Sequence, residues 1–129
     1  MRLTILLLAA LSAYSAGRPA DVPFKKLQLD AGANETAAFA DLNGDGKLDI
    51  VSGENWYEQS KIKGDWKKHH FRELGYFNNY IDAFSDLPLD VNGDGKIDIV
   101  SCTWFGKKIS WYQNPGKTGE PWKEHLIEL

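Results

Sequence analysis

A twelve-residue loop that occurs twice is the feature that most constrains the fold of this chain. The copies run from 41 to 52 and from 90 to 101, at an offset of 49 residues, and they differ only at their second and eighth positions. Each copy has oxygen-bearing side chains at positions 1, 3, 5 and 9 and glycines at positions 4 and 6. Glycines allow such a loop to wrap tightly, and oxygen ligands at alternate positions suit a hard cation such as calcium.

The predicted ligands are the same in both loops: three carboxylates, one side-chain amide and the backbone carbonyl of the lysine at position 7. Three carboxylates in one small loop repel one another unless a cation neutralises them. Magnesium fits less well because it prefers a stricter octahedron and keeps its waters. We therefore expect two structural calcium ions, held by Asp41, Asn43, Asp45, Lys47 and Asp49 in the first loop and by Asp90, Asn92, Asp94, Lys96 and Asp98 in the second.

An EF-hand shares much of this loop pattern, but it also needs a bidentate Glu at position 12 and a helix on each side. Position 12 is Ser52 in the first copy and Ser101 in the second, and an Asp-Ile-Val run typical of a strand precedes each serine. These departures disfavour an EF-hand. The remaining alternative is a pair of Asn-Gly-Asp-Gly turns that bind no metal.

The repeat extends beyond the loop and consists of short strands. Trp56-Tyr57 recurs as Trp111-Tyr112, and Trp66–His69 recurs as Trp122–His125. Helical periodicity is lacking outside the N-terminal segment. Four strands per unit of roughly 50 residues are typical of β-propeller blades, of which a ring contains about 4–8. The sequence thus predicts an all-β fold with two four-stranded blades, which form the N-terminal fragment of a larger ring.

The expected domain boundaries follow from this repeat. Residues 1–15 have the charged start and apolar run of a secretory signal, and the run is shorter than the roughly 20 residues that span a bilayer. The expected strand at Phe24–Leu29 would close the ring. The segments are therefore a signal peptide at 1–15, a linker at 16–23, a ring-closing strand and turn at 24–35, a first blade at 36–74 with its calcium loop at 41–49, and a second blade at 75–129 with its calcium loop at 90–98.

Charge and cysteine content limit the partners and the location of the protein. The net charge of −3 and the lack of a basic block disfavour a nucleic-acid partner. Cys102 is the only cysteine, so no intrachain disulfide forms and bound calcium could stabilise an exported chain instead. We expect a secreted, periplasmic or cell-surface protein with no membrane span after signal cleavage.

The two loops with their Asp-Ile-Val exits, together with the run Trp111–Gly116, resemble FG-GAP/VCBS repeats of integrin-α-like β-propellers from secreted bacterial proteins. The resemblance covers residues 24–129. It implies a ring of about seven blades, with calcium in the loop between the first two strands of each blade. It also implies that the remaining blades, in a longer chain, pack against this part.

Two functions remain as hypotheses. The first is a binding module for a protein or glycan ligand, in adhesion, in which calcium is structural. The alternative is the propeller portion of a secreted carbohydrate-active enzyme, because aldos-2-ulose dehydratase-like lyases have similar blades and similar Trp-Tyr-x-Asn-Pro-Gly runs. The sequence has no nucleophile elbow, zinc pattern or phosphate loop, so we assign no catalytic residue.

Several other residues have a structural and a functional interpretation. The recurring tryptophans are expected to pack between blades, whereas Trp104 has no counterpart and is the best candidate for a surface residue that stacks on a sugar. A structural role is also expected for His69, which recurs as His125. The recurring tryptophans are Trp56, Trp66, Trp111 and Trp122. We also expect Asp82 and Asp86 to be carboxylates whose hydrogen bonds are satisfied by nearby turns.

Overall fold

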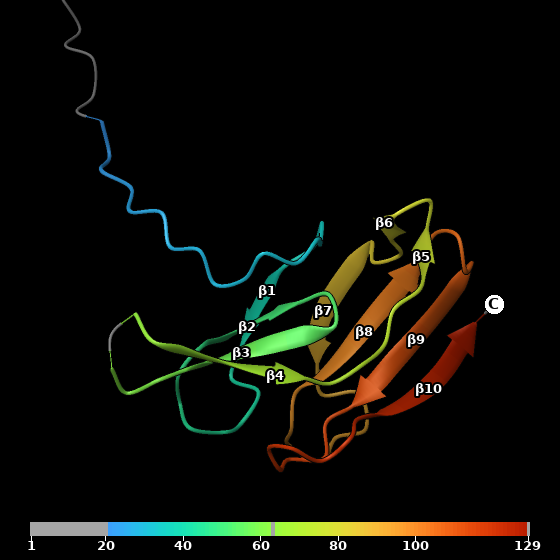
Figure 1. Ribbon diagram of the computed structural model, residues 1–129. Helices are drawn as coiled ribbons and strands as arrows, with labels where there is room; N and C mark the ends of the chain where they lie inside the picture. The colour runs from blue at the N-terminus through green and yellow to red at the C-terminus, as the bar shows by residue number, and fades with distance from the viewer. Residues whose placement is uncertain (1–20, 63, 129) are drawn as a thin grey trace, which may run out of the picture.

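The computed structural model describes residues 21–62 and 64–128, and all of the regular secondary structure in them is β (Figure 1). The predicted all-β class is therefore confirmed for this part of the chain. It includes no helix long and apolar enough to cross a bilayer. The expected signal peptide and most of the expected linker lie outside the described residues.

The first sheet is a four-stranded antiparallel meander whose strands follow the chain order. A tight turn at Gly53, which has a φ of 62°, connects its second and third strands. The first and second strands are joined by the first acidic loop. The strands are β1 (Ala38–Ala40), β2 (Asp49–Ser52), β3 (Asn55–Gln59) and β4 (Trp66–His70).

The second sheet repeats this arrangement, with the second acidic loop between its first two strands. A longer turn at 104–107 replaces the tight turn of the first sheet. The four strands predicted for each unit are therefore confirmed. The strands of the second sheet are β7 (Ser85–Leu89), β8 (Asp98–Thr103), β9 (Lys108–Gln113) and β10 (Lys123–Glu128).

A small hairpin that the sequence analysis did not predict lies between the two sheets in the chain. It consists of β5 (Tyr76–Phe77) and β6 (Tyr80–Ile81). The two residues between these strands, Asn78 and Asn79, have φ values of 49° and 64°. Two consecutive residues with positive φ form the type I′ turn that suits a two-residue hairpin, and asparagine tolerates this conformation well. The Asn-Asn pair between aromatic residues was the signal for this turn.

The strand expected at Phe24–Leu29 is not formed, and this prediction was wrong for the structure described here. A strand needs a partner for its backbone hydrogen bonds, and none of the ladders includes this segment. Instead, the residues that follow it lie against the first sheet. Asp30 accepts a hydrogen bond from the Tyr57 hydroxyl at 3.0 Å and pairs with the Lys68 ammonium at 2.5 Å.

The two sheets pack front to back rather than through equivalent faces. In the first sheet, Val51 pairs with Trp56 on the face that we call the front; the equivalent pair in the second sheet is Val100 with Trp111. The hydrophobic core joins the front of the first sheet to the opposite face, or back, of the second. Its buried members are Ala40, Leu42, Val51, Trp56, Phe71, Ile99 and Tyr112.

A buried ion pair joins the two units near β1 and β7. The side chains of Arg72 and Asp86 are both fully buried, at 0% exposed, and form a hydrogen-bonded salt bridge. Arg72 also donates to the Gly53 carbonyl at 2.8 Å, and the Thr36 hydroxyl donates to Asp86 at 2.6 Å. The guanidinium lies 5.0 Å from the ring centroid of Tyr112. This network ties both ends of the first unit to the first strand of the second.

Candidate metal-binding loops

Both acidic loops lie at the same end of the molecule, at the bottom of Figure 1, and the β5–β6 hairpin lies at the opposite end. The glycines at positions 4 and 6 have the left-handed conformation in both copies, with φ values of 76° and 81° in the first and 74° and 83° in the second. Other residues adopt this conformation at a cost, so the glycines allow the tight curvature. The residues concerned are Gly44, Gly46, Gly93 and Gly95.

The aspartate at position 1 organises the first loop through backbone hydrogen bonds. Its Oδ1 accepts from the amides of Gly44 at 2.8 Å and Asp45 at 3.0 Å, and its Oδ2 accepts from the amide of Gly46 at 2.8 Å. At position 3, the Oδ1 of Asn43 accepts from the amide of Asp45 at 3.0 Å. The side chains of Asp41 and Asn43 therefore turn toward the inside of the loop.

The lysine at position 7 neutralises the aspartate at position 5. The Lys47 ammonium lies 2.6 Å from the Oδ2 of Asp45, and the Lys47 amide donates to the Oδ1 at 3.0 Å. The hydrogen bond from the ammonium lowers the pKa of Asp45, and the same contact raises the pKa of Lys47. An internal cation thus occupies one oxygen of a predicted metal ligand.

The aspartate at position 9 is buried at the neck of the loop. Asp49 is 0% exposed, and its two oxygens accept from the amides of Leu42 at 3.0 Å and Gln59 at 2.9 Å. Burial raises the pKa of Asp49, against the opposing effect of these two hydrogen bonds. This carboxylate therefore fastens the start of the loop and the end of β3 to the first residue of β2.

The second loop reproduces these bonds one for one. Asp90 accepts from the amides of Gly93, Asp94 and Gly95 at 2.8, 3.1 and 2.9 Å. The remaining contacts correspond in the same way: Asn92 accepts from the Asp94 amide at 3.0 Å, the Lys96 ammonium lies 2.8 Å from Asp94, and buried Asp98 accepts from the amides of Val91 at 3.1 Å and Asn114 at 2.8 Å. The sequence repeat is thus a repeat of geometry, down to individual atoms.

The oxygen ligands that these residues offer suit calcium. Each carboxylate oxygen offers two lone pairs, so Asp41 keeps one of four after its three amide bonds, and Asp49 keeps two after its two bonds. Asn43 and Asp45 retain further acceptor capacity, and the ligand set is made of oxygen alone, as hard cations prefer. The residues therefore have enough unused acceptors to contribute to an oxygen shell.

The side chains are not arranged as a preformed metal centre. Across the part of the chain that the structure describes, no three His, Cys, Asp or Glu side chains are gathered as a metal centre requires. In each loop, the aspartate at position 9 faces backbone amides and the aspartate at position 5 faces a lysine. An ion bound in either loop would therefore share the position 5 carboxylate with the ammonium of Lys47 or Lys96. The ten predicted ligands therefore remain a prediction.

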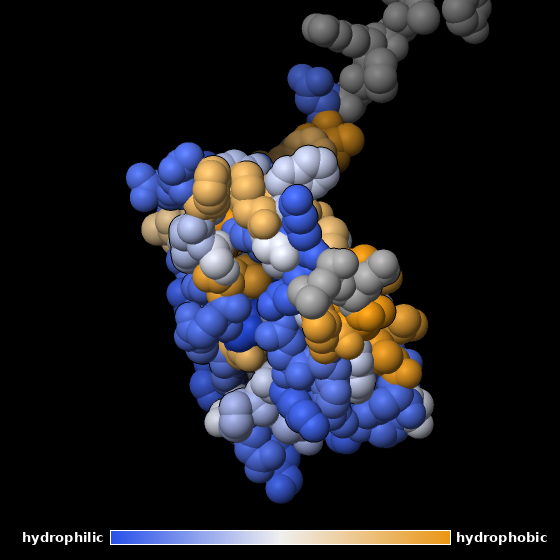
Figure 2. Space-filling model, turned by 90° about the vertical axis from the view of Figure 1, so that its right-hand side faces the viewer, coloured by the Kyte–Doolittle hydropathy of each residue, from blue (hydrophilic) through white to orange (hydrophobic). Residues whose placement is uncertain are grey.

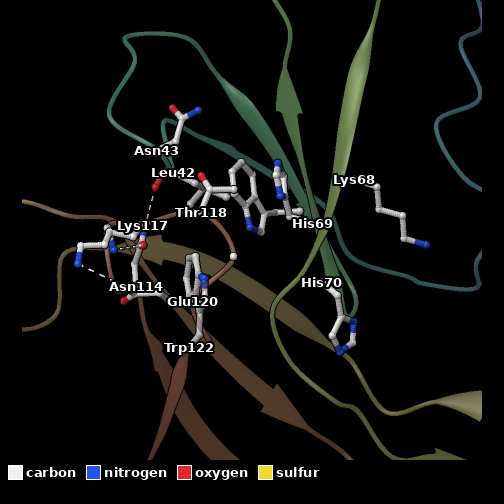
Figure 3. A pocket seen from close by; sticks show the side chains of 13 residues that line it. Leu42, Asn43, Lys68, His69, His70, Asn114, Lys117, Thr118, Glu120 and Trp122 are labelled. Carbon is white, nitrogen blue, oxygen red and sulfur yellow. Dashed lines mark hydrogen bonds and ion pairs between the residues drawn. The ribbon is translucent and has the colours of Figure 1, made fainter.

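Asn114 links the two loops, a role that the sequence analysis missed. Its side-chain Nδ2 donates to the carbonyl of Leu42 in the first loop at 2.7 Å (Figure 3). The same nitrogen donates to the carbonyl of Ile97 in the second loop at 3.0 Å. The residue is buried, at 3% exposed. Its sequence, Asn-Pro-Gly, indicated only a turn. The equivalent position in the first unit is Gln59, so a comparison of the two units could have identified this position as distinct.

A polar pocket of about 230 Å³ separates the first sheet from the β9–β10 connection (Figure 3). His69 stacks on Trp56 with centroids 4.2 Å apart and pairs with Glu58 at 2.8 Å, and His70 pairs with Glu73 at 2.8 Å. His125 stacks on Trp111 at the same separation of 4.2 Å. These histidines thus contribute ring stacking and side-chain hydrogen bonds to the packing of the two units.

The remaining candidates have structural contacts. Asp82 accepts three backbone amide bonds from the turn at 104–106, and Asp86 belongs to the buried ion pair described above. Cys102 is half-buried, and its sulfur accepts a hydrogen bond from Ser85 Oγ at 3.3 Å. Trp104 is 69% exposed, which agrees with its selection as a surface residue.

Comparison with known proteins found no match, whether to family models, to curated proteins or to solved structures.

Proposed function

We propose that this chain is part of a secreted, calcium-stabilised β-propeller of the FG-GAP/VCBS type, with a role in binding a protein or glycan ligand. The two calcium ions are structural: each holds together the first two strands of a blade. The N-terminal signal, the further blades in a longer chain and the location outside the cytoplasm belong to this proposal.

The observation that carries the proposal is the front-to-back stacking of two equivalent sheets. Val51 and Trp56 on the front of the first sheet are 0% and 4% exposed, because the second sheet covers them. The equivalent Val100 and Trp111 on the front of the second sheet are only half-buried. A front-to-back interface leaves one complementary face free at each end, so further copies can be added, and twisted units that meet at an angle close into a ring.

The exposed faces support this interpretation. Leu87 and Leu89, in the first strand of the second sheet, are 57% and 51% exposed. Figure 2, which views the molecule from the side of β10, shows an apolar area midway along this side as well. Exposed apolar surface of this kind marks an interaction site. We expect another sheet of the same type to cover this surface, in the way that the second sheet covers the front of the first.

Calcium in this proposal acts on stability. The carboxylates at positions 1, 5 and 9, the amide at position 3 and the carbonyl at position 7 would hold it, and the ion would supply the positive charge that the lysines provide in part. Because Asp49 and Asp98 connect each loop to two strands, an ion held by them would reinforce the sheet. A ligand that binds only the folded state stabilises it by about 2.7 kcal/mol at 100 times its Kd.

The proposal predicts that calcium raises the melting temperature of the chain relative to the same protein in chelator. The variant Asp45→Ala/Asp94→Ala should lose this shift, and each single variant should keep part of it. The matched control is Asp65→Ala, which removes an exposed aspartate from a turn outside the loops. Thermal melts followed by circular dichroism give the measurement. An unchanged melt at millimolar calcium, or an equal shift in the double variant, would show that the loops do not bind the ion.

A further inference from the structure

The end of the molecule opposite the acidic loops carries an aromatic cluster for which the first unit has no counterpart. Its rings come from the β5–β6 hairpin, from the segment before β7 and from the β8–β9 turn. In the first unit, the β2–β3 turn has only Gly53 and Glu54 between its paired residues, whereas residues 104–107 occupy the equivalent turn of the second. Residues that do not recur are unnecessary for the repeated sheet, and this cluster therefore calls for a separate explanation.

The cluster is exposed to solvent. Trp104, Phe105, Tyr80 and Phe84 are 69%, 41%, 39% and 37% exposed. Together they line a hollow of about 410 Å³ with no other lining residue among those described. Figure 2 shows pale-orange apolar side chains at the upper end of the molecule, which is the end where β5 and β6 lie in Figure 1. Exposed aromatic clusters of this type mark binding sites more often than scattered apolar residues do.

Asp82 holds the turn that carries two of the rings in a fixed conformation. Its carboxylate, 5% exposed, accepts from the amides of Trp104 at 2.7 Å, Phe105 at 3.1 Å and Gly106 at 2.7 Å. A Cβ at Gly106 would lie 2.7 Å from the Thr103 hydroxyl, so glycine permits this close approach. Anchoring by buried groups reduces the entropy that a site loses when it binds.

The rings that line the hollow are inclined to one another by 36° to 83° and do not form a flat platform. Phe105 lies at 83° to Tyr80 with centroids 6.1 Å apart, and at 73° to Phe84 with centroids 6.4 Å apart. Trp104 is inclined by 41° to Phe84 at 6.1 Å. Rings that face a common space from different directions form an aromatic cage, and cages of this kind bind quaternary ammonium groups through the negative faces of their rings.

The charge and polarity around the hollow agree with a cation. Glu35 accepts a hydrogen bond from the Tyr80 hydroxyl, and Asp82 lies beneath the turn, so two carboxylates adjoin the rings. Of the four lining side chains, only Tyr80 and Trp104 carry a polar group, and Tyr80 already uses its hydroxyl. A sugar needs several hydrogen bonds to its hydroxyl groups, which this lining does not provide. Lys107 is on the same turn but does not line the hollow.

We propose that Tyr80, Phe84, Trp104 and Phe105 form a binding site for the trimethylammonium group of a small quaternary ammonium compound. The positive charge would lie against the ring faces, with the carboxylates of Glu35 and Asp82 close by. This site is separate from the acidic loops, and its proposal is independent of the calcium assignment.

Titration of the full chain with choline tests this site, with 3,3-dimethylbutan-1-ol as a neutral analogue of the same shape. We expect choline to shift the indole N–H resonance of Trp104 in NMR spectra and to bind at least about tenfold more tightly than the alcohol, a ratio that corresponds to about 1.4 kcal/mol. Trp104→Leu, which keeps an apolar side chain but removes the ring, should abolish binding. Phe39→Leu, which changes an aromatic residue that is 64% exposed and outside the cluster, should not.

Two further measurements separate charge from apolar contact. Lys107→Gln removes the one ammonium on the turn and should strengthen choline binding. Methyl glucoside serves as the sugar probe and should not bind. Three outcomes would each overturn the proposal. These are equal binding of choline and the neutral alcohol, binding of the sugar alone, and no binding of choline at concentrations up to about 50 mM. The titration is carried out both in chelator and in calcium, so failure of the calcium assignment does not affect the outcome.

Discussion

The two units of this protein are alike at one end and different at the other. At the end of the acidic loops, the hydrogen bonds of Asp41 recur around Asp90 with distances that agree within 0.1 Å. At the opposite end, the first unit has a tight turn at Gly53, and the second has the longer turn at 104–107 together with the β5–β6 hairpin. The repeated end builds the sheet, and the end without repetition provides a surface that only the second unit has.

The junction between the units also has no counterpart. Asp86 of the second unit occupies the position of Ala37 in the first, as the pairing of Leu87 with Val100 and of Ala38 with Val51 shows. A change here should affect the assembly of the two sheets and not the internal structure of either.

A large effect is expected from breaking the junction with Asp86→Ala. This substitution leaves the buried guanidinium of Arg72 without its counter-ion, and loss of one partner of a buried pair costs about 3–5 kcal/mol of unfolding free energy. Urea denaturation measures the loss. The double variant Arg72→Met/Asp86→Ala should recover much of it, because no uncompensated charge remains buried.

The matched control for this prediction is Glu120→Ala, which breaks an ion pair with Lys117 at 3.4 Å between exposed side chains. Exposed pairs contribute about 0–1 kcal/mol. If Asp86→Ala costs no more than Glu120→Ala, the ion pair does not hold the units together.

A second prediction compares two equivalent tryptophans. Trp56 and Trp111 both stack on a histidine at 4.2 Å, but Trp56 is 4% exposed and Trp111 is only half-buried. Trp56→Ala should cost about 3–5 kcal/mol, the usual range for a buried aromatic residue, and Trp111→Ala less, by roughly 1–2 kcal/mol. Urea denaturation of both variants tests this difference. Equal losses would mean that another surface covers the front of the second sheet in solution.

The smallest effect is expected at the back of the first sheet. The Lys68 ammonium holds the pKa of Asp30 well below its usual range, with help from the Gly32 amide and the Tyr57 hydroxyl, and burial together with this carboxylate raises the pKa of Tyr57 to about 12. Because the pKa of Asp30 is lower in the folded state, its contribution to stability is present above about pH 4 and is lost as the pH falls further.

Melting temperatures of the wild type and of Asp30→Asn between pH 6 and pH 3 measure this contribution (the range extends about two units above and one unit below a normal aspartate pKa). The gap between the two proteins should be widest at pH 6 and should narrow in acid, whereas Asp65→Asn, a change in an exposed turn, should leave the profile unchanged. A gap that is constant with pH would show that the segment after Leu29 is not held on the sheet by this charge.

Much of the fold could be predicted from the sequence because its decisive interactions are local. The alternating polarity and β-branched residues around each loop predicted the four strands of each unit, and the Gly-x-Gly pattern predicted the tight curvature that Gly44 and Gly46 show. The β5–β6 hairpin was missed because its signal, Asn78-Asn79, is short. The strand expected at Phe24–Leu29 was wrong because a strand also depends on a partner, which this segment does not have in the structure.

The candidate sites also differ in how far they could be predicted from the sequence. The acidic loops could be identified from spacing alone, because the predicted ligands of each lie within nine consecutive positions. Asn114 could not, since its role depends on the Leu42 carbonyl, which belongs to the other unit. The aromatic cage was visible only in part, through Trp104, because its rings come from three separate segments.

The sequence by itself determined the repeated unit: the acidic loop, the strands on each side of it and the equivalence of the two copies. These features depend on backbone conformation and on hydrogen bonds between near neighbours in the chain. The tertiary structure decided which face of each sheet is covered, that Arg72 and Asp86 are buried together, and that four aromatic rings surround one hollow. Burial and charge pairing depend on residues that the chain brings together from a distance, so the tryptophans of the two Trp-Tyr pairs, Trp56 and Trp111, have different environments.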